Sequence, residues 1–500
     1  MSEFPVPTLL DSLATPSATV RRWLPRLALR GLGLRASERQ LLLFTVDLAL
    51  LCASLVVAVK LRTPWLDPPG AVYANWRWIV TLAAVWVVVS QLLDCYDLAR
   101  AASAPYSMLN AGISAVLTVA IYQLIPLVTP SLESRSLMLI FALLSLGSIC
   151  VWRGFYAVVF VQPAFHRNVL VYGAGWAGRA LVEALPPSSA PGNPFRGTGY
   201  QIIGFVDDDP AIHRGGGMSG LPVLGGCADL LRLAREHQVD EVVLAITHRN
   251  LMSQAAFDAV LACQETGIPV TTVPALYERL LGRLPVDHIG RDIGAVLKSA
   301  SGPSERFYWG FKRLVDLLAG ALGMMVVAIL IPLVWLANAV LCPGPIFYRQ
   351  VRAGRAGHPF TLVKFRTMMP DAERATGPVW TADKDRRITK VGRLLRKSRL
   401  DELPQLYNVL RGEMSLVGPR PERPELIDGL VLQIPFYRAR HCVRPGITGW
   451  AQVRFGYGNT IDAARTKLEY DLYYIRHADL YLDAIIWLKT AAVVFGLRGQ

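Results

Sequence analysis

Cysteine is scarce in this chain, and the few copies are not placed as a disulfide framework or a zinc site would need. There are seven cysteines in 500 residues. They are scattered, and no two form a C-x-x-C pair, which argues against disulfide-stapled and zinc-binding domains. Acidic residues are also few: 38 Asp and Glu stand against 52 Lys and Arg, a net charge of +14. We therefore expect anionic partners.

The positive charge is concentrated in one segment. Residues 346–425 hold 17 Lys and Arg against 9 Asp and Glu. Such a patch suits nucleic acid, anionic lipid or a phosphorylated substrate. No nucleic-acid-binding motif accompanies the charge, and a long apolar segment adjoins it. The sequence therefore favours lipid or a phosphorylated ligand and predicts no nucleic-acid partner.

Four apolar runs in the first third of the chain are long enough to cross a bilayer. They cover residues 41–59, 78–93, 108–128 and 136–152. The first run contains Asp47, which we expect to face the other helices because a carboxylate in lipid is costly. A basic arm of 40 residues precedes this run, and no small-residue cleavage site closely follows it. We therefore do not expect a cleaved signal sequence.

The charge of the flanking segments predicts the orientation of these runs. The arm carries six arginines against three acids, which favours a cytoplasmic N terminus. Lys60 and Arg62 in the first loop argue weakly for the opposite orientation. With the arm in the cytoplasm, four crossings return the chain to that side near residue 160.

After the fourth run, short apolar strands alternate with helical stretches. The segments that show this alternation are 168–185, 201–210, 228–247 and 268–274. The pattern is typical of an α/β unit with a parallel sheet.

A glycine-rich turn, GAGWAG, lies in this α/β unit and contains Gly173, Gly175 and Gly178. It follows a predicted strand and opens a predicted helix, so its amides have the arrangement that cradles a phosphate. The acidic residue that usually follows about 20 positions later is missing, and the nearest acids, from Asp207 to Asp209, come about 30 positions later. Two interpretations stay open: a bound nucleotide, or glycines that only permit a tight turn.

A further segment, residues 317–341, contains no charged residue, and its length alone predicts a fifth crossing. Pro332 near its middle removes a backbone hydrogen bond and bends the helix. Each arm is then too short to cross about 30 Å of hydrocarbon. Lys312 and Arg313 before the segment, like the basic stretch after it, belong on the cytoplasmic side. We therefore expect a re-entrant helix that enters and leaves on the same face.

Two adjacent carboxylates, Asp401 and Glu402, lie in the stretch SRLDELPQLYNVLRG. Leucines at helical spacing and the terminal Gly412 place the pair at a predicted helix N terminus. A capping box formed by Ser398 and Asp401 would explain the acids without any chemistry. Adjacent helical residues point about 100° apart, so we do not expect the two carboxylates to share a proton.

Several cations occur close to this pair in the sequence and favour a reactive site over a cap. They are Lys364, Arg366, Arg396 and Arg420. So many fixed cations suit a diphosphate. Phosphoryl transfer needs a nucleophile, a divalent cation and positive charge on the equatorial oxygens. A carboxylate at a helix N terminus beside arginine stays ionised, so Asp401 is the candidate nucleophile and Glu402 the candidate Mg²⁺ ligand.

The C-terminal part resembles the bacterial sugar transferases, also called monotopic phosphoglycosyl transferases, which load a phosphosugar onto polyprenyl phosphate. The resemblance covers roughly residues 307–498. It rests on the segments FKRLVDLL, PGPIFYRQVRAG, VKFRTM, SRLDELPQLYNVLRGEMSLVGPRPE, RPGITGWAQV and KLEYDLYYIRHADLYLDAIIWLKT. The N-terminal helices and the α/β unit are similar to those of long-form members.

This resemblance implies an activity and a set of residue roles. A sugar-1-phosphate from a UDP-sugar, UDP-glucose or UDP-galactose, would pass to undecaprenyl phosphate through an adduct on Asp401, with release of UMP. Asp401 and Glu402 would form the Mg²⁺ site, and Lys364, Arg396 and Arg420 would contact phosphate. The product would start exopolysaccharide assembly at the bacterial inner membrane. Downstream glycosyltransferases and a second copy of the chain are the expected protein partners.

Two departures from the family pattern bear on these expectations. Ile331 precedes the proline of the membrane helix, where many members have serine. The segment WAQVRFGYGNT differs from the commoner LWQVSGR and resembles members linked to exopolysaccharide and exosortase-associated gene clusters. The identity of the sugar therefore stays open.

The expected fold is membrane α plus α/β. A basic cytoplasmic arm (1–40) would precede four transmembrane helices (41–162) and a Rossmann-like parallel-sheet domain (163–300). A re-entrant helix broken at Pro332 (307–343) would lead into a mostly helical catalytic domain (344–500). Two other functions remain: a membrane-anchored, nucleotide-dependent oxidoreductase or epimerase that uses GAGWAG, and an inactive membrane scaffold for polysaccharide assembly.

Overall fold

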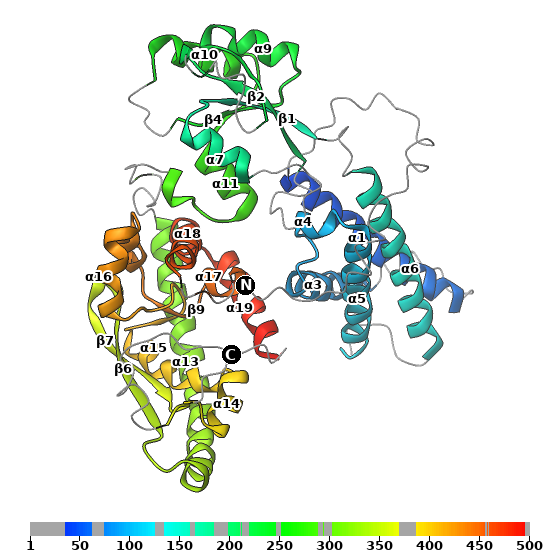
Figure 1. Ribbon diagram of the computed structural model, residues 1–500. Helices are drawn as coiled ribbons and strands as arrows, with labels where there is room; N and C mark the ends of the chain where they lie inside the picture. The colour runs from blue at the N-terminus through cyan, green and yellow to red at the C-terminus, as the bar shows by residue number, and fades with distance from the viewer. Residues whose placement is uncertain are drawn as a thin grey trace. The chain divides into compact units, whose positions relative to one another are not determined.

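The computed structural model divides into two compact units, Met1–Leu281 and Gly282–Gln500, shown in Figure 1. The residues it describes are 36–62, 75–125, 135–160, 166–184, 199–210, 212, 220–246, 252–288, 294, 303–369, 387–455, 458 and 460–495. Most of the predicted N-terminal arm, residues 1–35, lies outside the described residues.

The first unit begins with a bundle of apolar helices. These are α1 (Ala36–Arg62), α3 (Trp76–Leu92), α5 (Ala104–Gln123) and α6 (Arg135–Val159), with the short α4 (Leu98–Ala101) after α3. Helix α6 packs on both α1 and α5, and α3 packs on α5. By length and composition α1, α5 and α6 are able to cross a membrane, while α3 is shorter. The four predicted membrane helices are thus confirmed as elements.

An ion pair lies inside this bundle. Arg153 on α6 donates from Nε to Oδ1 of Asp47 on α1 at 3.2 Å, and from Nη2 to Oδ2. The third donor group, Nη1, bonds to the carbonyl of Cys95 at 2.9 Å. Both side chains are almost fully buried. The prediction that Asp47 faces other helices is therefore confirmed.

The rest of the first unit is an α/β fold with a five-stranded parallel sheet of order β3-β2-β1-β4-β5. The strands are β1 (Arg167–Tyr172), β2 (Tyr200–Val206), β3 (Val223–Gly225), β4 (Glu241–Leu244) and β5 (Val270–Thr272). Side chains alternate across a strand, so Val169 and Val171 join one core and Leu170 and Tyr172 the other.

The helices of this fold cover both faces of the sheet. Helices α7 (Trp176–Ala184) and α11 (Val273–Leu281) cover the face of Val169, and α9 (Leu230–Glu236), preceded by the turn η4 (Cys227–Asp229), and α10 (Gln254–Glu265) cover the other. The Rossmann-like fold is confirmed, although β3 lies outside the segments that the sequence predicted.

The second unit is mostly helical, as expected. After the turn η6 (Val286–His288) and the long helix α13 (Pro303–Leu341), an antiparallel hairpin is formed by β6 (Phe347–Ala353) and β7 (Pro359–Phe365), with η7 (Arg355–Gly357) at its tip. The elements that follow are α14 (Lys390–Lys397), η8 (Leu400–Gln405), α15 (Leu406–Arg411), β8 (Ser415–Val417), α16 (Pro424–Gln433), η9 (Tyr437–Cys442), β9 (Gly446–Thr448), α17 (Trp450–Arg454), α18 (Ile461–His477) and α19 (Leu480–Phe495). Strands β8 and β9 pair in parallel.

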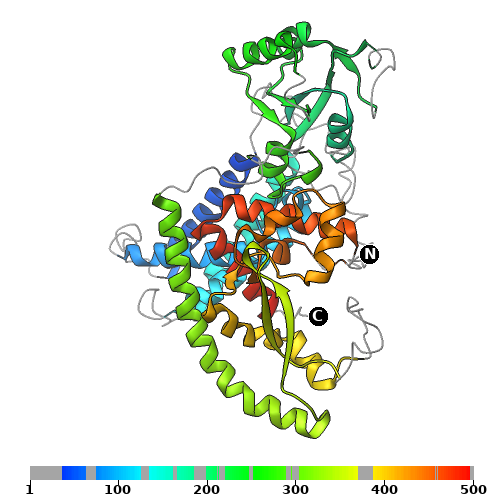
Figure 2. The ribbon, with the colours of Figure 1, turned by 90° about the vertical axis from the view of Figure 1, so that its left-hand side faces the viewer.

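Helix α13 corrects the expectation of a break at Pro332. The helix is continuous through this proline, and Figure 2 shows its ribbon curving instead of stopping. Tyr308 near the start packs in one core with residues of α18 and α19, and Val327 and Val334 pack with Phe365 of β7. Both halves of α13 are therefore anchored on the same C-terminal unit, while many of its other large apolar side chains are exposed.

Candidate active site

The two adjacent carboxylates lie on η8, a tight 3₁₀ turn that leads directly into α15. Arg399 before the turn adopts a left-handed conformation with φ 61°, and no side chain caps η8. Ser398 instead donates its hydroxyl to carbonyls in the last turn of α14. The capping-box interpretation is therefore wrong, because Ser398 closes the preceding helix and Asp401 is not part of a cap.

Two cations hold Glu402. Its Oε1 accepts a hydrogen bond from Nζ of Lys364 at 3.0 Å and another from Nη2 of Arg420 at 2.7 Å. Lys364 comes from β7 and Arg420 from the loop after β8, so three segments meet at this carboxylate. Burial alone would raise the pKa of Glu402, but the charges of Arg420 and Lys364 outweigh burial and hold this pKa well below its usual range. Glu402 is therefore ionised at neutral pH.

Asp401 differs from its neighbour because, within the described residues, no group donates a hydrogen bond to its carboxylate. The residue is 8% exposed. Its carboxylate oxygens are not fully enclosed, so solvent can reach them. Burial and the charge of Glu402 raise the pKa of Asp401 to about 6, against the opposing charges of Lys364, Arg396 and Arg420. A carboxylate beside cations, unpaired and reachable from solvent, has the properties of a nucleophile.

This raised pKa limits the pH range of one expectation from the sequence. The neighbouring arginines were expected to keep Asp401 ionised. Burial and the adjacent Glu402 have the larger effect on its pKa, so Asp401 is mostly ionised at pH 7 and titrates just below neutrality.

The other two predicted cations have different surroundings. Arg396 on α14 donates from Nε to the hydroxyl of Thr367 at 2.9 Å, and its charge acts on Asp401. Arg366 is 6% exposed and donates to the carbonyls of Pro345 at 2.7 Å and of Cys342 at 2.6 Å. These contacts favour a structural role for Arg366 at the end of α13 over the predicted phosphate contact.

Asn408 on α15 is a contributor that the sequence did not reveal. Its Oδ1 accepts from the amide of Val363 at 3.2 Å, and its Nδ2 donates to the carbonyl of Thr361 at 2.8 Å and to Glu413 at 2.7 Å. The residue is 1% exposed, so every one of these bonds is made in the interior. Asn408 thereby fixes β7, the strand of Lys364, against the helix that follows the acidic pair. The sequence signal for this role was a single amide residue on the apolar side of the predicted helix.

The carboxylate pair fits a partial Mg²⁺ site. The described residues contain no cluster of three His, Cys, Asp or Glu side chains that would hold a metal alone. Mg²⁺ is commonly bound by one or two carboxylates together with substrate phosphates and water. Asp401 has an unpaired carboxylate, and Glu402 uses only Oε1 for its two cations, so both offer the hard oxygen ligands that Mg²⁺ prefers.

The glycine-rich turn of the α/β unit is already occupied by a carboxylate of the chain itself. Asp207 accepts a hydrogen bond from the amide of Ala174 at 2.6 Å. It directly follows β2, so the acid that seemed missing from the sequence is present at the edge of the neighbouring strand. Gly173 has φ 108°. A Cβ added at Gly178 would lie 2.1 Å from the carbonyl oxygen of Gly173. Gly173 and Gly178 are thus required by the turn, and a phosphate at the Ala174 amide would have to displace Asp207.

Two protein families match the chain. The bacterial sugar transferase family matches residues 307–497, which include nearly all of α13 and every later element. A CoA-binding domain family matches residues 91–262, from the end of α3 to within α10.

Curated relatives match across both parts of the chain. It is 37% identical over 320 residues to the UDP-N-acetylgalactosamine-undecaprenyl-phosphate N-acetylgalactosaminephosphotransferase of Aeromonas hydrophila. This match covers 61% of the chain and 70% of the relative. The UDP-glucose:undecaprenyl-phosphate glucose-1-phosphate transferase of Xanthomonas campestris pv. campestris is 32% identical over 310 residues, covering 61% and 63%. The glucose-1-phosphate transferase of the same name from Caulobacter vibrioides is 43% identical over 218 residues, covering 42% and 80%. Together with the acidic pair and its cations, these matches show that the chain belongs to the bacterial sugar transferase family.

Proposed function

We propose that this protein transfers a sugar-1-phosphate from a UDP-sugar to undecaprenyl phosphate through a covalent adduct on Asp401, with release of UMP. The observation that carries the proposal is the asymmetry of the pair. Glu402 is held by two cations, whereas the carboxylate of Asp401 has no partner among the described residues. Relatives in the family are named for transfer between UDP-sugars and undecaprenyl phosphate, which supports the same substrate classes here.

The first half of the reaction forms the adduct. A carboxylate oxygen of Asp401 attacks the phosphorus that carries the sugar, the bond from that phosphorus to the bridging oxygen breaks, and UMP leaves with the electron pair. Lys364, Arg396 and Arg420 offset the negative charge that gathers on the phosphate oxygens. Mg²⁺, when bound by Asp401 and Glu402, would add further positive charge to the diphosphate.

The second half transfers the phosphosugar to lipid. A phosphate oxygen of undecaprenyl phosphate attacks the same phosphorus, and the bond between that phosphorus and Asp401 breaks. The carboxylate is regenerated and a diphosphate-linked lipid sugar is formed. Splitting the reaction in this way lets one set of cations serve both displacements.

Helix α13 supports a placement of the site at the membrane surface. Its exposed apolar side chains suit lipid, and its two halves both pack on the C-terminal unit. A helix that crossed the bilayer would carry one of its ends about 30 Å away from a domain on the other face. This packing agrees with the re-entrant arrangement and with a catalytic unit on the cytoplasmic face of the bacterial inner membrane.

The direct test is UMP release by the purified protein with undecaprenyl phosphate, Mg²⁺ and a panel of UDP-sugars. The panel should hold UDP-glucose, UDP-galactose and their N-acetyl forms, because the relatives are named for different sugars. We expect release with at least one sugar, its loss when EDTA removes Mg²⁺, and its return with excess Mg²⁺. Release from none of them would contradict the proposal and favour the membrane scaffold.

The raised pKa of Asp401 predicts an acid limb in the pH profile. Because attack requires the ionised carboxylate, kcat/KM should rise with pH through about 6 and fall about tenfold for each pH unit below that value. Glu402, with its lowered pKa, should add no limb in this range. UMP release between pH 5 and 8 measures the profile at several low Mg²⁺ concentrations, because Mg²⁺ bound by Asp401 would move the limb to lower pH.

A second carboxylate provides the control for this profile. Glu469 on α18 is buried beside Arg283, and burial raises its pKa to about 7. Its described contacts are with Arg283, Val286 and Leu284, away from the acidic pair, so Glu469→Gln should leave the limb in place. If that variant moved or removed the limb, the assignment to Asp401 would be wrong.

The oxidoreductase or epimerase alternative has no comparable support. Its glycine-rich turn is engaged by Asp207, and the charged groups that suit group transfer lie in the other unit. The inactive-scaffold alternative is opposed by the assembled contacts of Glu402 with Lys364 and Arg420.

A further inference from the structure

The loop that carries Arg420 is fixed by its backbone carbonyls. The carbonyl of Arg420 accepts a hydrogen bond from Nη2 of Arg440 at 3.0 Å. The carbonyl of Pro421 accepts one from Nη1 of Arg352 at 3.1 Å. The carbonyl of Glu422 accepts one from the amide of Ala353 at 3.0 Å. Prolines at 419 and 421 have no amide hydrogen to donate. The loop therefore depends on donors from other elements to hold its position.

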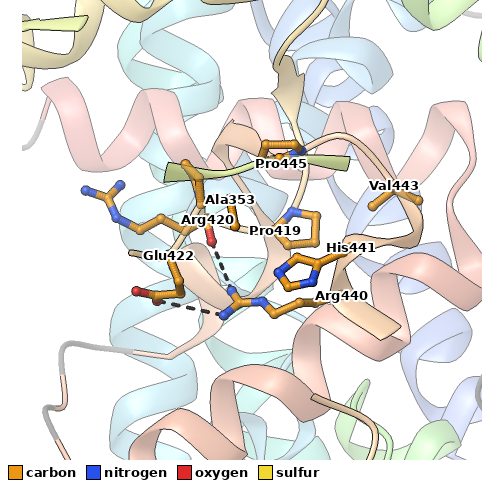
Figure 3. A pocket seen from close by; sticks show the side chains of 10 residues that line it. Ala353, Pro419, Arg420, Glu422, Arg440, His441, Val443 and Pro445 are labelled. Atoms are coloured by element: carbon orange, nitrogen blue, oxygen red, sulfur yellow. Dashed lines mark hydrogen bonds and ion pairs between the residues drawn. The ribbon is translucent and has the colours of Figure 1, made fainter. Parts of the chain in front are cut away.

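Arg440 on η9 is the more enclosed of the two arginine donors. It is 7% exposed, and besides the Arg420 carbonyl its Nη2 bonds to Oδ2 of Asp471, which is 2% exposed, at 2.9 Å. Its Nη1 donates to the hydroxyl of Tyr437 and lies 3.8 Å from Glu422. In Figure 3 the Arg440 guanidinium points at the Arg420 carbonyl, while the Arg420 side chain extends away from the pocket.

The shape of a guanidinium is what makes this connection possible. One planar group reaches a carboxylate, a hydroxyl and a carbonyl at once, in fixed directions. A lysine ammonium keeps the charge but offers a single nitrogen, so it cannot bond to Asp471, Tyr437 and the Arg420 carbonyl in the same geometry. The connection links α18, where Asp471 lies, to the loop whose side chain reaches Glu402 at 2.7 Å.

We propose that Arg440 is a positioning residue for the transfer reaction: through the backbone carbonyl of Arg420, it sets where the Arg420 guanidinium meets Glu402. The proposal rests on the proposed function. In the part of the chain that the structure describes, Arg440 contacts neither carboxylate of the acidic pair, so its effect on chemistry passes through Arg420. Displacing a reacting or charge-stabilising group by about 1 Å is enough to lower a rate up to 100-fold.

The test is a double-mutant cycle on UMP release with Arg440→Lys, Arg420→Ala and the double variant. We expect Arg440→Lys to lower kcat/KM by about 10- to 100-fold. In the Arg420→Ala background the same change should have less than about a threefold effect. Independent, multiplied losses in the double variant would overturn the proposal.

Controls separate positioning from folding. Arg438→Lys is the matched substitution on the same turn, at an exposed residue, and should leave the rate unchanged. Thermal unfolding of each variant shows whether it is folded. If Arg440→Lys does not fold, Asp471→Asn replaces it in the cycle, because it weakens the hold on Arg440 while preserving side-chain shape. Full activity in a folded Arg440→Lys protein would also overturn the proposal.

A readout without turnover distinguishes this inference from the proposed function. Hydrogen–deuterium exchange in the peptide that spans Arg420 reports how firmly this loop is held. Exchange there should rise in Arg440→Lys and stay unchanged in Arg438→Lys. Absence of UMP release by the wild-type protein would contradict the function, whereas unchanged exchange in Arg440→Lys would contradict the positioning role alone.

Discussion

Replacing Asp401 with asparagine should reduce UMP release by roughly 10³-fold or more, because the amide keeps the shape of the side chain but loses the nucleophile. The folded structure should survive, since Asp401 has no hydrogen-bond partner among the described residues to lose. Initial rates with the best UDP-sugar, measured beside thermal unfolding, check both expectations. With the wild-type protein, omission of undecaprenyl phosphate should leave a phosphosugar attached to Asp401, visible as added protein mass and absent from Asp401→Asn.

Two other substitutions sharpen this experiment. Asp428→Asn makes the same chemical change on the exposed surface of α16 and should leave the rate unchanged. Glu402→Gln removes the adjacent charge and should lower the rate without preventing formation of the adduct. If Asp401→Asn turned over normally, or if the added mass mapped to another residue, the covalent mechanism would be wrong.

Replacing Asp47 with leucine should destabilise the helix bundle by about 3–5 kcal/mol, because Arg153 then keeps a charge in the interior without its partner. Arg153 loses two hydrogen bonds to the carboxylate and keeps only the carbonyl of Cys95. Thermal unfolding in detergent, or resistance to proteolysis in membranes, measures the loss.

The double variant Asp47→Leu with Arg153→Met should recover most of that stability, since exchanging a whole buried pair for apolar side chains is far milder than breaking it. Thr45→Leu, at an exposed position on the same helix, is the matched control and should change little. If Asp47→Leu unfolded at the wild-type temperature, the pair would not be a structural element of the bundle.

Local patterns predicted most of the fold. Apolar runs gave the helices α1, α3, α5 and α6 because crossing length and hydropathy are properties of contiguous residues. The alternation of apolar strands and helices predicted a parallel sheet, since only crossover connections produce that order. Strand β3 was missed because it lies in GLPVLGG, where glycine and proline interrupt the apolar residues.

Predictions of where a helix begins, ends or breaks were less successful. Pro332 was expected to break the membrane helix, yet α13 continues through it. Proline removes only one hydrogen bond, and packing of Val327 and Val334 on the C-terminal unit holds the helix on both sides. Ser398 was expected to begin a helix and instead ends one.

The sequence by itself determined the chemical class of the site: an acidic pair among arginines and lysines, next to an apolar segment, predicts work on phosphate at a membrane. Only the tertiary structure decided which acid is held and which is unpaired, because the partners of Glu402 lie 38 and 18 residues away along the chain. It likewise directed Arg366 to the end of α13 and brought Asp207 to the glycine-rich turn. A charge acts through distance in space, and contacts between remote segments set that distance.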